Sequence, residues 1–335
     1  MPKIPEMQSK KIANFLLNNA ILILLIAISI AVGIFRPTFF SMLNASNLIR
    51  NTAVRFVIAL GVSGCLIAKG TDLSAGRSVG LAGCLAATFL QRTDYASKVY
   101  PDMGDINIIL VLLGVVLIAI FFGAVNGTVV SILKVPPFIA TLGMQTIIYG
   151  ICLVYTGAQP IGGIRADYMI ISSGSLFNVL MLPYLGFIAF ACGALIWFVY
   201  NKTSHGKYLY AIGGNENAAE VNGINTVRTK ILIYASAGAL YGLAGFLLGA
   251  KAGGTSVNLG MGYELEAIAG CTIGGVSTTG GVGRVSGILV GVLVFELLKI
   301  AMQFMGVKSD YTYIVQGLVI ILAVAVDMRK YVAKK

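Results

Sequence analysis

The chain has 335 residues, of which 57% are apolar and 11% are charged, and its mean hydropathy is +0.88. Soluble domains carry about 25% charged residues, so this composition cannot form a water-facing surface and the main solvent must be lipid. The formal net charge of +11 would indicate nucleic acid in a soluble protein. In a membrane protein it marks cytoplasmic segments instead, so we expect no nucleic-acid partner.

Charged residues divide the chain into apolar segments that predict an all-α, polytopic membrane protein with about ten transmembrane helices. Such a chain leaves no room for a second folded domain, so residues 1–335 are expected to form a single transmembrane domain. In chain order, the expected spans are 14–35, 53–68, 78–90, 107–133, 138–156, 178–200, 231–250, 265–276, 285–303 and 312–328. The first is too long for a signal-peptide core and should be retained.

The distribution of basic residues predicts the orientation of the chain. An even number of spans places both termini on one side of the membrane, and both termini are rich in lysine. Placing them in the cytoplasm assigns 15 Lys and Arg to inner segments and 8 to outer ones, in agreement with the positive-inside rule.

Some expected spans are too short to cross a bilayer as one helix. The short intervals between charges are 55–69 with 13 uncharged residues, 77–92 with 14 and 284–296 with 11. These lengths predict broken or re-entrant helices, because irregular backbone at membrane depth is stable only where it is buried in protein or lines a wet cavity.

Two segments resemble each other and predict two pseudo-repeated halves. Residues 64–80 read GCLIAKGTDLSAGRSVG, and residues 270–287 read GCTIGGVSTTGGVGRVSG. Both contain Gly-Cys, an Ile two residues after the Cys, a turn of small polar residues and Gly-Arg-x-x-Gly. Duplicated halves with interrupted hydrophobic segments point to a transport site. We expect both turns to face a shared pathway; the alternative is that they only pack.

The candidate pathway residues lie in or beside these turns: Thr71, Asp72, Ser74, Thr141, Ser277, Thr278 and Thr279. A lone carboxylate at membrane depth costs roughly 2.5–3.5 kcal/mol on insertion scales, so Asp72 should be paired or hydrated. Hydroxyl-bearing, nearly uncharged walls suit a neutral polyhydroxylated solute. In the alternative reading, Asp72 and Ser74 cap the free amides at the start of the third span, and Thr141 only packs.

The longest polar stretch, residues 201–230, is expected to be a cytoplasmic loop, and its centre at 213–224 reads GGNENAAEVNGI. A favourable N-cap and a later glycine predict a helix of about two turns, which is too short to be stable without a partner surface. We expect a coupling segment that transmits force from outside the membrane, formed by Asn215, Asn217, Ala218, Ala219 and Gly223. The alternative is a loop helix that packs on its own protein.

The chain lacks the G-x-x-x-x-G-K-[ST] phosphate-binding loop and any nucleophile–base arrangement of an enzyme. Any nucleotide hydrolysis must therefore come from a partner, so no catalytic residue and no cofactor are expected in this chain. No metal site is expected either, because the five cysteines lie in apolar segments without ligand spacing. Glu296 and Lys299 share a helical face, either as a neutralising ion pair or as a proton relay of a secondary transporter.

Four motifs in combination resemble the permease subunits of bacterial carbohydrate-uptake ABC transporters of the ribose/galactose type, and especially their galactose/methyl galactoside group. They are GTDLSAGR at 70–77, VPPFIATLG at 135–143, AIGGNENAAEVNGIN at 211–225 and GGVSTTGGVG at 274–283. The resemblance implies a permease domain of the bacterial inner membrane that pairs with a second permease copy. It also implies a cytoplasmic ATPase subunit that binds ATP and Mg, and a periplasmic sugar-binding protein.

The resemblance further implies that Asn217-Ala218-Ala219 with Gly223 does the work of the Glu-Ala-Ala…Gly coupling segment of importer permeases. Asn217 stands where that pattern has glutamate. The motifs do not identify the sugar, because a permease for ribose or another pentose would carry the same motifs.

Overall fold

The protein is described by a computed structural model over residues 20–332, without the side chains of 20–26, 28, 309 and 326–332. Within that range it is all-helical, with no β-strand. The helices are α2 (Ala20–Phe35), η1 (Pro37–Phe40), α3 (Met42–Ile67), α4 (Ala75–Phe89), α5 (Ile108–Ser131), α6 (Pro137–Thr156), α7 (Ala166–Ser173), η2 (Leu176–Asn178), α8 (Tyr184–Lys202), α9 (Ser204–Gly214), α10 (Glu216–Val221), α11 (Thr226–Ala252), α12 (Tyr263–Ile273), α13 (Val285–Phe304) and α14 (Ser309–Val332). Six of them are long and apolar enough to cross a membrane, namely α3, α5, α6, α8, α11 and α13.

These helices confirm the predicted class of all-α, polytopic membrane protein. Each expected span overlaps one helix, although the start of the span 14–35 lies outside the described residues. The remaining four, α2, α4, α12 and α14, have shorter described apolar stretches.

The three intervals predicted to be broken belong to continuous helices. The interval 77–92 belongs to α4, which is a single helix of 15 residues. The interval 55–69 belongs to α3, which is a continuous helix of 26 residues, and the interval 284–296 belongs to α13, which has 20. Their charged residues do not end the helices because Arg55 of α3 forms an ion pair with Glu296 of α13, with a distance of 3.2 Å between Nη1 and Oε2. A paired, buried charge can remain inside a helix that a lone charge would end.

The shortest apolar helix, α12, follows an irregular segment at 253–262 that is packed against α4. A Cβ atom added at Gly80 of α4 would lie 2.4 Å from the carbonyl oxygen of Leu259. The glycine therefore lets this non-helical backbone approach the helix, which buries it in protein. On its other side α12 packs closely on α13, where a Cβ at Gly274 would lie 2.2 Å from the carbonyl oxygen of Gly287.

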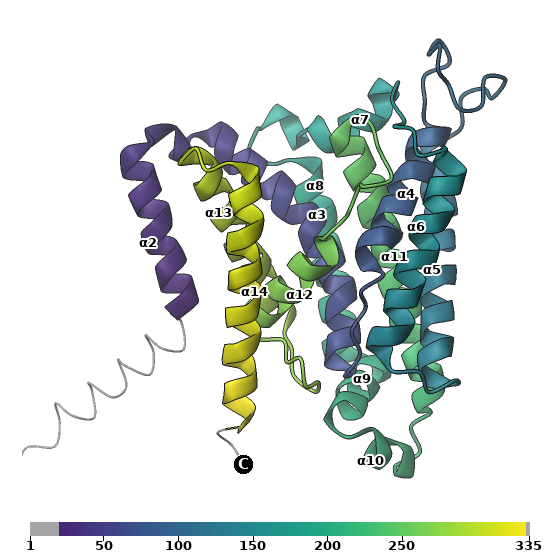
Figure 1. Ribbon diagram of the computed structural model, residues 1–335, viewed down its shortest axis with the longest axis vertical. Helices are drawn as coiled ribbons and strands as arrows, with labels where there is room; N and C mark the ends of the chain where they lie inside the picture. The colour runs from purple at the N-terminus through teal and green to yellow at the C-terminus, as the bar shows by residue number, and fades with distance from the viewer. Residues whose placement is uncertain (1–19, 333–335) are drawn as a thin grey trace, which may run out of the picture.

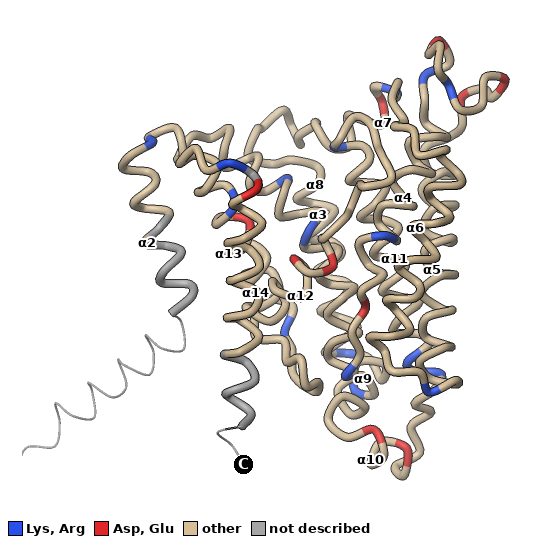
Figure 2. The backbone as a smooth tube through the Cα atoms, in the orientation of Figure 1, with Lys and Arg blue, Asp and Glu red and all other residues tan. Residues whose placement is uncertain are grey.

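The two ends of the bundle differ (Figure 1). Helices α9 and α10 extend from one end, where the described start of α2 and the end of α14 also lie. Helix α7 and the loop at 90–107 lie at the opposite end, and charged residues gather mainly at both ends (Figure 2). The start of α2 and the end of α14 thus agree with termini on one side. The basic residues at 1–19 and 333–335, on which the predicted orientation partly rests, lie outside the described residues.

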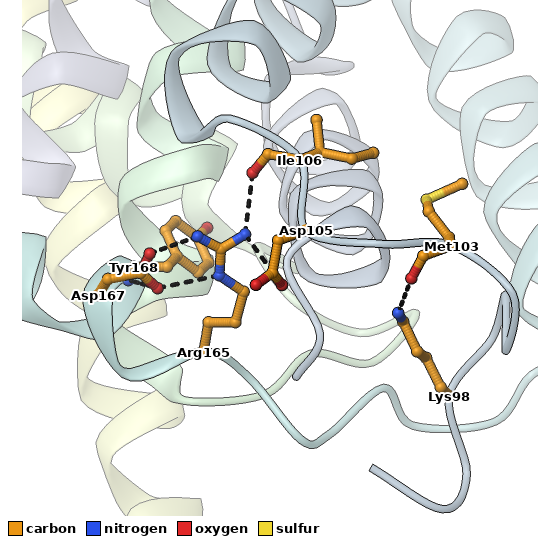
Figure 3. A network of polar contacts seen from close by, with 7 residues as sticks. All are labelled: Lys98, Met103, Asp105, Ile106, Arg165, Asp167 and Tyr168. Carbon is orange, nitrogen blue, oxygen red and sulfur yellow. Dashed lines mark hydrogen bonds and ion pairs between the residues drawn. The ribbon is translucent and has the colours of Figure 1, made fainter. Parts of the chain in front are cut away.

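At the end of the bundle opposite α10, Arg165 joins the start of α7 to the loop before α5 (Figure 3). Its Nη1 atom donates a hydrogen bond of 2.9 Å to the carbonyl oxygen of Ile106 and lies 3.5 Å from Asp105 Oδ1. Its Nε atom donates to Asp167 Oδ1 at 3.1 Å, and this guanidinium holds the pKa of Asp167 below its usual value. The contacts hold the start of α7 against the chain that enters α5.

Candidate functional site

The first turn, residues 68–74, is held by a hydroxyl group from α6. Thr141 is fully buried, and its Oγ1 atom donates to the carbonyl oxygens of Thr71 at 3.1 Å and Pro137 at 2.9 Å. The same atom accepts a hydrogen bond of 3.1 Å from the amide of Leu73. Thr141 therefore fixes the turn through its backbone, and the predicted residues Thr71 and Thr141 are brought together.

Asp72 and Ser74 form a second buried contact in this turn. Asp72 Oδ1 accepts hydrogen bonds from the Ser74 amide at 3.0 Å and the Ser74 hydroxyl at 2.6 Å. Ser74 is the N-cap residue of α4, but its side chain accepts no hydrogen bond from an amide of that helix. Asn126 of α5 donates from Nδ2 to Ser74 Oγ at 2.9 Å. All three side chains are at most 1% exposed. Asn126 was missed from the sequence, although an amide inside a long uncharged apolar stretch is a usable signal.

Polar atoms without partners surround this contact. Among the described residues, Asp72 Oδ2, Asn126 Oδ1 and the hydroxyl oxygens of Tyr234 and Tyr241 on α11 are buried and accept or donate no hydrogen bond. Such groups are rare in protein interiors. The turn and its neighbours therefore have hydrogen-bonding atoms that the fold itself does not use.

The second turn, residues 274–284, holds the other predicted hydroxyl groups. Ser277 and Thr279 share a hydrogen bond of 2.8 Å between their side-chain oxygens, and the Ser277 amide donates to the carbonyl oxygen of Val282 at 2.9 Å. Ser277 is buried, whereas Thr278 and Thr279 are partly exposed. These residues form their own cluster, separate from Asp72.

The helices that precede the two turns end in the same way. After α3, the amides of Ala68 and Gly70 donate to the carbonyl oxygens of Gly64 and Cys65 at 3.2 and 2.8 Å. After α12, the corresponding amides at 274 and 276 donate to the carbonyl oxygens at 270 and 271 at 2.9 and 2.9 Å. Lys69 has a left-handed φ of 62°, which costs about 1 kcal/mol for a residue with a side chain. Its counterpart is Gly275, with a φ of 83°.

The two turns contact each other and α9. The amide of Gly281 donates to the carbonyl oxygen of Ile67 at the end of α3, at 2.8 Å. A Cβ atom at Gly213 of α9 would lie 1.8 Å from that same oxygen and 2.5 Å from the amide nitrogen of Gly281. Tyr210 of α9 donates its hydroxyl proton to the carbonyl oxygen of Gly283 at 2.9 Å. A displacement of α9 must therefore act on the second turn and on the end of α3, directly before the first turn.

The predicted coupling segment has the expected caps. Asn215 Oδ1 accepts a hydrogen bond of 3.1 Å from the amide of Ala218, which confirms the N-cap. After α10, Gly223 has a φ of 82°, and the amide of Ile224 donates to the carbonyl oxygen of Ala219 at 3.1 Å. This is a Schellman end. Asn215, Gly223 and two further predicted residues of the segment, Asn217 and Ala218, are exposed, whereas Ala219 is buried.

Helix α10 is also fastened to the start of α11. Lys230 Nζ lies 2.6 Å from Glu216 Oε1, and Thr226 Oγ1 donates to Glu220 Oε1 at 2.8 Å. The helix itself has only six residues, too few to be stable alone. These contacts present it at the end of the bundle as a firmly held projection.

A charged network that the sequence did not predict crosses three helices. Arg55 Nε donates to Glu266 Oε2 at 2.8 Å, and Lys299 Nζ lies 2.7 Å from Glu266 Oε1. With the pair between Arg55 and Glu296, the network has two positive and two negative groups. Glu296 and Lys299 do share a helical face, but each pairs with a residue of another helix.

We expect Glu266→Gln to destabilise the protein by about 3 kcal/mol, because two buried cations lose their shared carboxylate. Glu296→Gln should cost about 1 kcal/mol, since Arg55 keeps Glu266 as its partner. Thermal unfolding of the purified variants in detergent measures the difference. Equal midpoints would show that Glu266 does not hold the network together.

The five cysteines are thiols packed among the helices. Cys65, Cys84, Cys152 and Cys271 are buried, Cys192 is half-buried, and all five are free thiols. No group of three or more His, Cys, Asp or Glu side chains that could hold a metal occurs within the described residues.

Comparisons with known proteins decide the class. A family model described as a permease component of the branched-chain amino acid transport system matches residues 44–324. The chain belongs to this permease family. It is therefore the transmembrane component of a transport system rather than its ATPase, and the permease is a multi-pass membrane protein.

Among individual proteins, the permease is 42% identical to the galactose/methyl galactoside import permease protein MglC of Escherichia coli (strain K12), covering 98% of this chain and 99% of the relative. Identity to the protein of the same name in Haemophilus influenzae is 43%, over 98% and 99% of the two chains. The ribose import permease protein RbsC of Bacillus subtilis (strain 168) is 36% identical over 90% and 89%. No solved structure matches the permease significantly.

Proposed function

We propose that the permease is the membrane-spanning subunit of an ATP-driven ABC importer for a monosaccharide, with galactose or a methyl galactoside as the cargo. The observation that carries this proposal is the 42% identity to the galactose/methyl galactoside import permease of Escherichia coli along 98% of the chain. Ribose or another pentose is the runner-up. The lower identity to the ribose permeases, 36% or less, favours galactose.

The proposed assembly contains two copies of the permease in the bacterial inner membrane, with both termini in the cytoplasm. A cytoplasmic ATPase subunit, which carries ATP and Mg, binds at α10, and a periplasmic sugar-binding protein docks at the opposite end. The exposed side chains of Asn217 and Ala218 at the tip of the bundle support the first contact. The end that carries α7 and Arg165 is the one available for the second.

In this assembly the ATPase moves α10, and α9 passes the movement to both turns. The contacts of Gly213 and Tyr210 with the second turn, and of Gly213 with the end of α3, support such a route. A change at Ile67 or Gly281 would then alter the pathway at the ends of α3 and α12 together. The predicted pathway residues, Asp72 and Ser277 among them, lie directly after these helix ends.

We also propose that the chain spans the membrane about ten times as two related halves. The like-shaped ends of α3 and α12 support the relation between the halves, because both reverse at the same motif position. In this proposal, α2, α4, α12 and α14 are the remaining four spans. The irregular segment at 253–262, which precedes α12, is the break in a membrane-embedded segment.

A proton-coupled secondary transporter is a less favoured alternative. It would use Glu296 or Asp72 as the proton site. The ion pair of Glu296 with Arg55 favours a structural carboxylate instead. Uptake by the Glu296→Gln variant should stay within about threefold of the unchanged protein, because the amide keeps the shape of the side chain and Arg55 keeps Glu266. Loss of uptake with a loss of its pH dependence would favour the proton-coupled alternative.

The decisive test is purification of the permease from its own cells. We expect it to bring down an ATP-hydrolysing subunit whose activity rises when a galactose-loaded binding protein is added. Sealed vesicles should then accumulate galactose only with ATP and both partners present. Uptake by the permease alone, without nucleotide, would overturn the proposal. If ATP hydrolysis rises with a ribose-loaded but not with a galactose-loaded binding protein, the cargo is ribose and the rest of the proposal stands.

A further inference from the structure

A polar cavity of about 330 Å³ lies between α3, α12, α13 and α14. Its size is in the range of small-molecule sites, which begins at about 300 Å³. Its polar and aromatic lining consists of Arg55, Tyr263, Glu266, Lys299, Gln303, Thr312, Tyr313 and Gln316. Three of these residues, Arg55, Glu266 and Lys299, belong to the charged network described above, and none belongs to the two turns or to α10.

Each charged side chain that lines this cavity has a partner of opposite charge. Glu266 holds both Arg55 and Lys299, and Arg55 also pairs with Glu296. The network therefore offers polar atoms in fixed positions without an unpaired charge. An ion or a phosphate would find no unmatched partner here, whereas a neutral polar solute could accept and donate hydrogen bonds at the network's edge.

The opposite wall offers unused hydrogen-bonding groups. Gln316 and Thr312 of α14 are 6% and 9% exposed and line the cavity. Among the described residues their side chains make no hydrogen bond. Buried amides and hydroxyls are normally paired, so these two groups can bind a solute in the cavity without giving up a hydrogen bond to a described residue. Tyr263 and Tyr313 add apolar ring faces.

The position of the cavity suits a solute arriving from the side opposite α10. Its lining uses the C-terminal half of α13 and the first turns of α14, which meet at that end of the bundle (Figure 1). Arg55 lies about 20 Å along α3 from its first residue, at 1.5 Å per residue, so the wall reaches membrane depth. Charged groups at this depth mark solute pathways in many membrane proteins.

The permease has a larger groove of about 600 Å³ beside α8, but apolar side chains such as Phe56, Phe190 and Trp197 line it almost entirely. A sugar would lose its hydrogen bonds to water there without replacement, which costs several kcal/mol. From the paired charges, the amide and hydroxyl groups without a partner among the described residues, and the location, we infer that the cavity at Gln316 is a binding site for a neutral polyhydroxylated solute. This inference rests on the proposed function and identifies where the permease itself holds the sugar.

Binding of radiolabelled galactose to the purified permease–ATPase complex, without the binding protein, tests the site. We expect Gln316→Leu and Thr312→Val each to weaken binding about tenfold, which corresponds to about 1.4 kcal/mol. The matched controls are Gln145→Leu and Thr146→Val on α6, which lies outside the cavity. They should bind galactose as the unchanged complex does.

ATP hydrolysis stimulated by the galactose-loaded binding protein provides the check on folding and assembly. In the two control variants it should stay within about twofold of the unchanged complex, because neither touches α10 or α9. For the two cavity variants, recovery of the ATPase subunit in the same amount as with the unchanged permease checks folding and assembly. Galactose binding unaffected by both cavity variants, or no binding by a complex that transports galactose, would overturn the inference. A complex that fails to transport galactose with ATP would instead overturn the proposed function.

Discussion

Replacing Gly223 by arginine is expected to abolish ATP-driven sugar uptake while the permease still inserts into the membrane. Gly223 has a φ of 82°, and a Cβ atom there would meet no other atom within 4 Å. The substitution therefore fits sterically and costs only about 1 kcal/mol of backbone strain. The guanidinium projects beside the exposed face of α10. At the centre of an interface, an unpaired charge costs about 2 kcal/mol or more.

The control for this experiment is Gly157→Arg. Gly157 follows α6, has a φ of 58° and also has open space around a Cβ atom, but it lies at the other end of that helix from the coupling segment. It carries the same strain and the same added charge, so it should keep the ATPase subunit bound during purification. Uptake assays and co-purification measure both variants. Normal uptake by Gly223→Arg would remove the role of α10 in coupling.

Replacing Asp72 by leucine is expected to impair sugar uptake far more than replacing Ser277 by alanine. Leucine removes the acceptor for both the amide and the hydroxyl of Ser74. Each buried donor left unpaired costs about 1–3 kcal/mol, and Asn126 is bound to that same hydroxyl. The Ser277→Ala variant loses the contacts with Thr279, which is partly exposed, and should cost about 0.5–1 kcal/mol.

The Asp72→Asn variant separates the shape of the turn from its charge. The amide keeps an acceptor oxygen for Ser74, so the turn should fold and uptake should remain above about half of normal. Initial rates of uptake at equal membrane content measure all three variants. If neither Asp72→Leu nor Ser277→Ala reduces the initial rate of uptake, the two turns serve only in packing.

The ends of α10 were predictable because capping depends on nearest neighbours. An asparagine side chain reaches an amide three residues ahead, and a glycine alone relaxes the left-handed φ that ends a Schellman motif. Asn215 and Gly223 therefore took their predicted positions. The related ends of α3 and α12 were visible for the same reason, since both sequence segments carry Gly-Cys one turn before the reversal.

The lengths of α3 and α13 were not predictable from the spacing of charges. Whether a charge ends a membrane helix depends on its partner, and the partners of Arg55 are 211 and 241 positions away, at Glu266 and Glu296. Nothing in the local sequence distinguishes an arginine that faces solvent from one that is neutralised by another helix.

Composition and periodic apolar runs were sufficient for the class of protein, the helices and the exposed coupling segment, because burial in lipid and helix capping act through single residues and short segments. The cavity at Gln316, the hold of Thr141 and Asn126 on the first turn, and the contact of Gly213 with the second turn and the end of α3 depended on packing. Each joins residues more than 50 positions apart, and only folding brings such residues within the few ångströms over which hydrogen bonds and close contacts act.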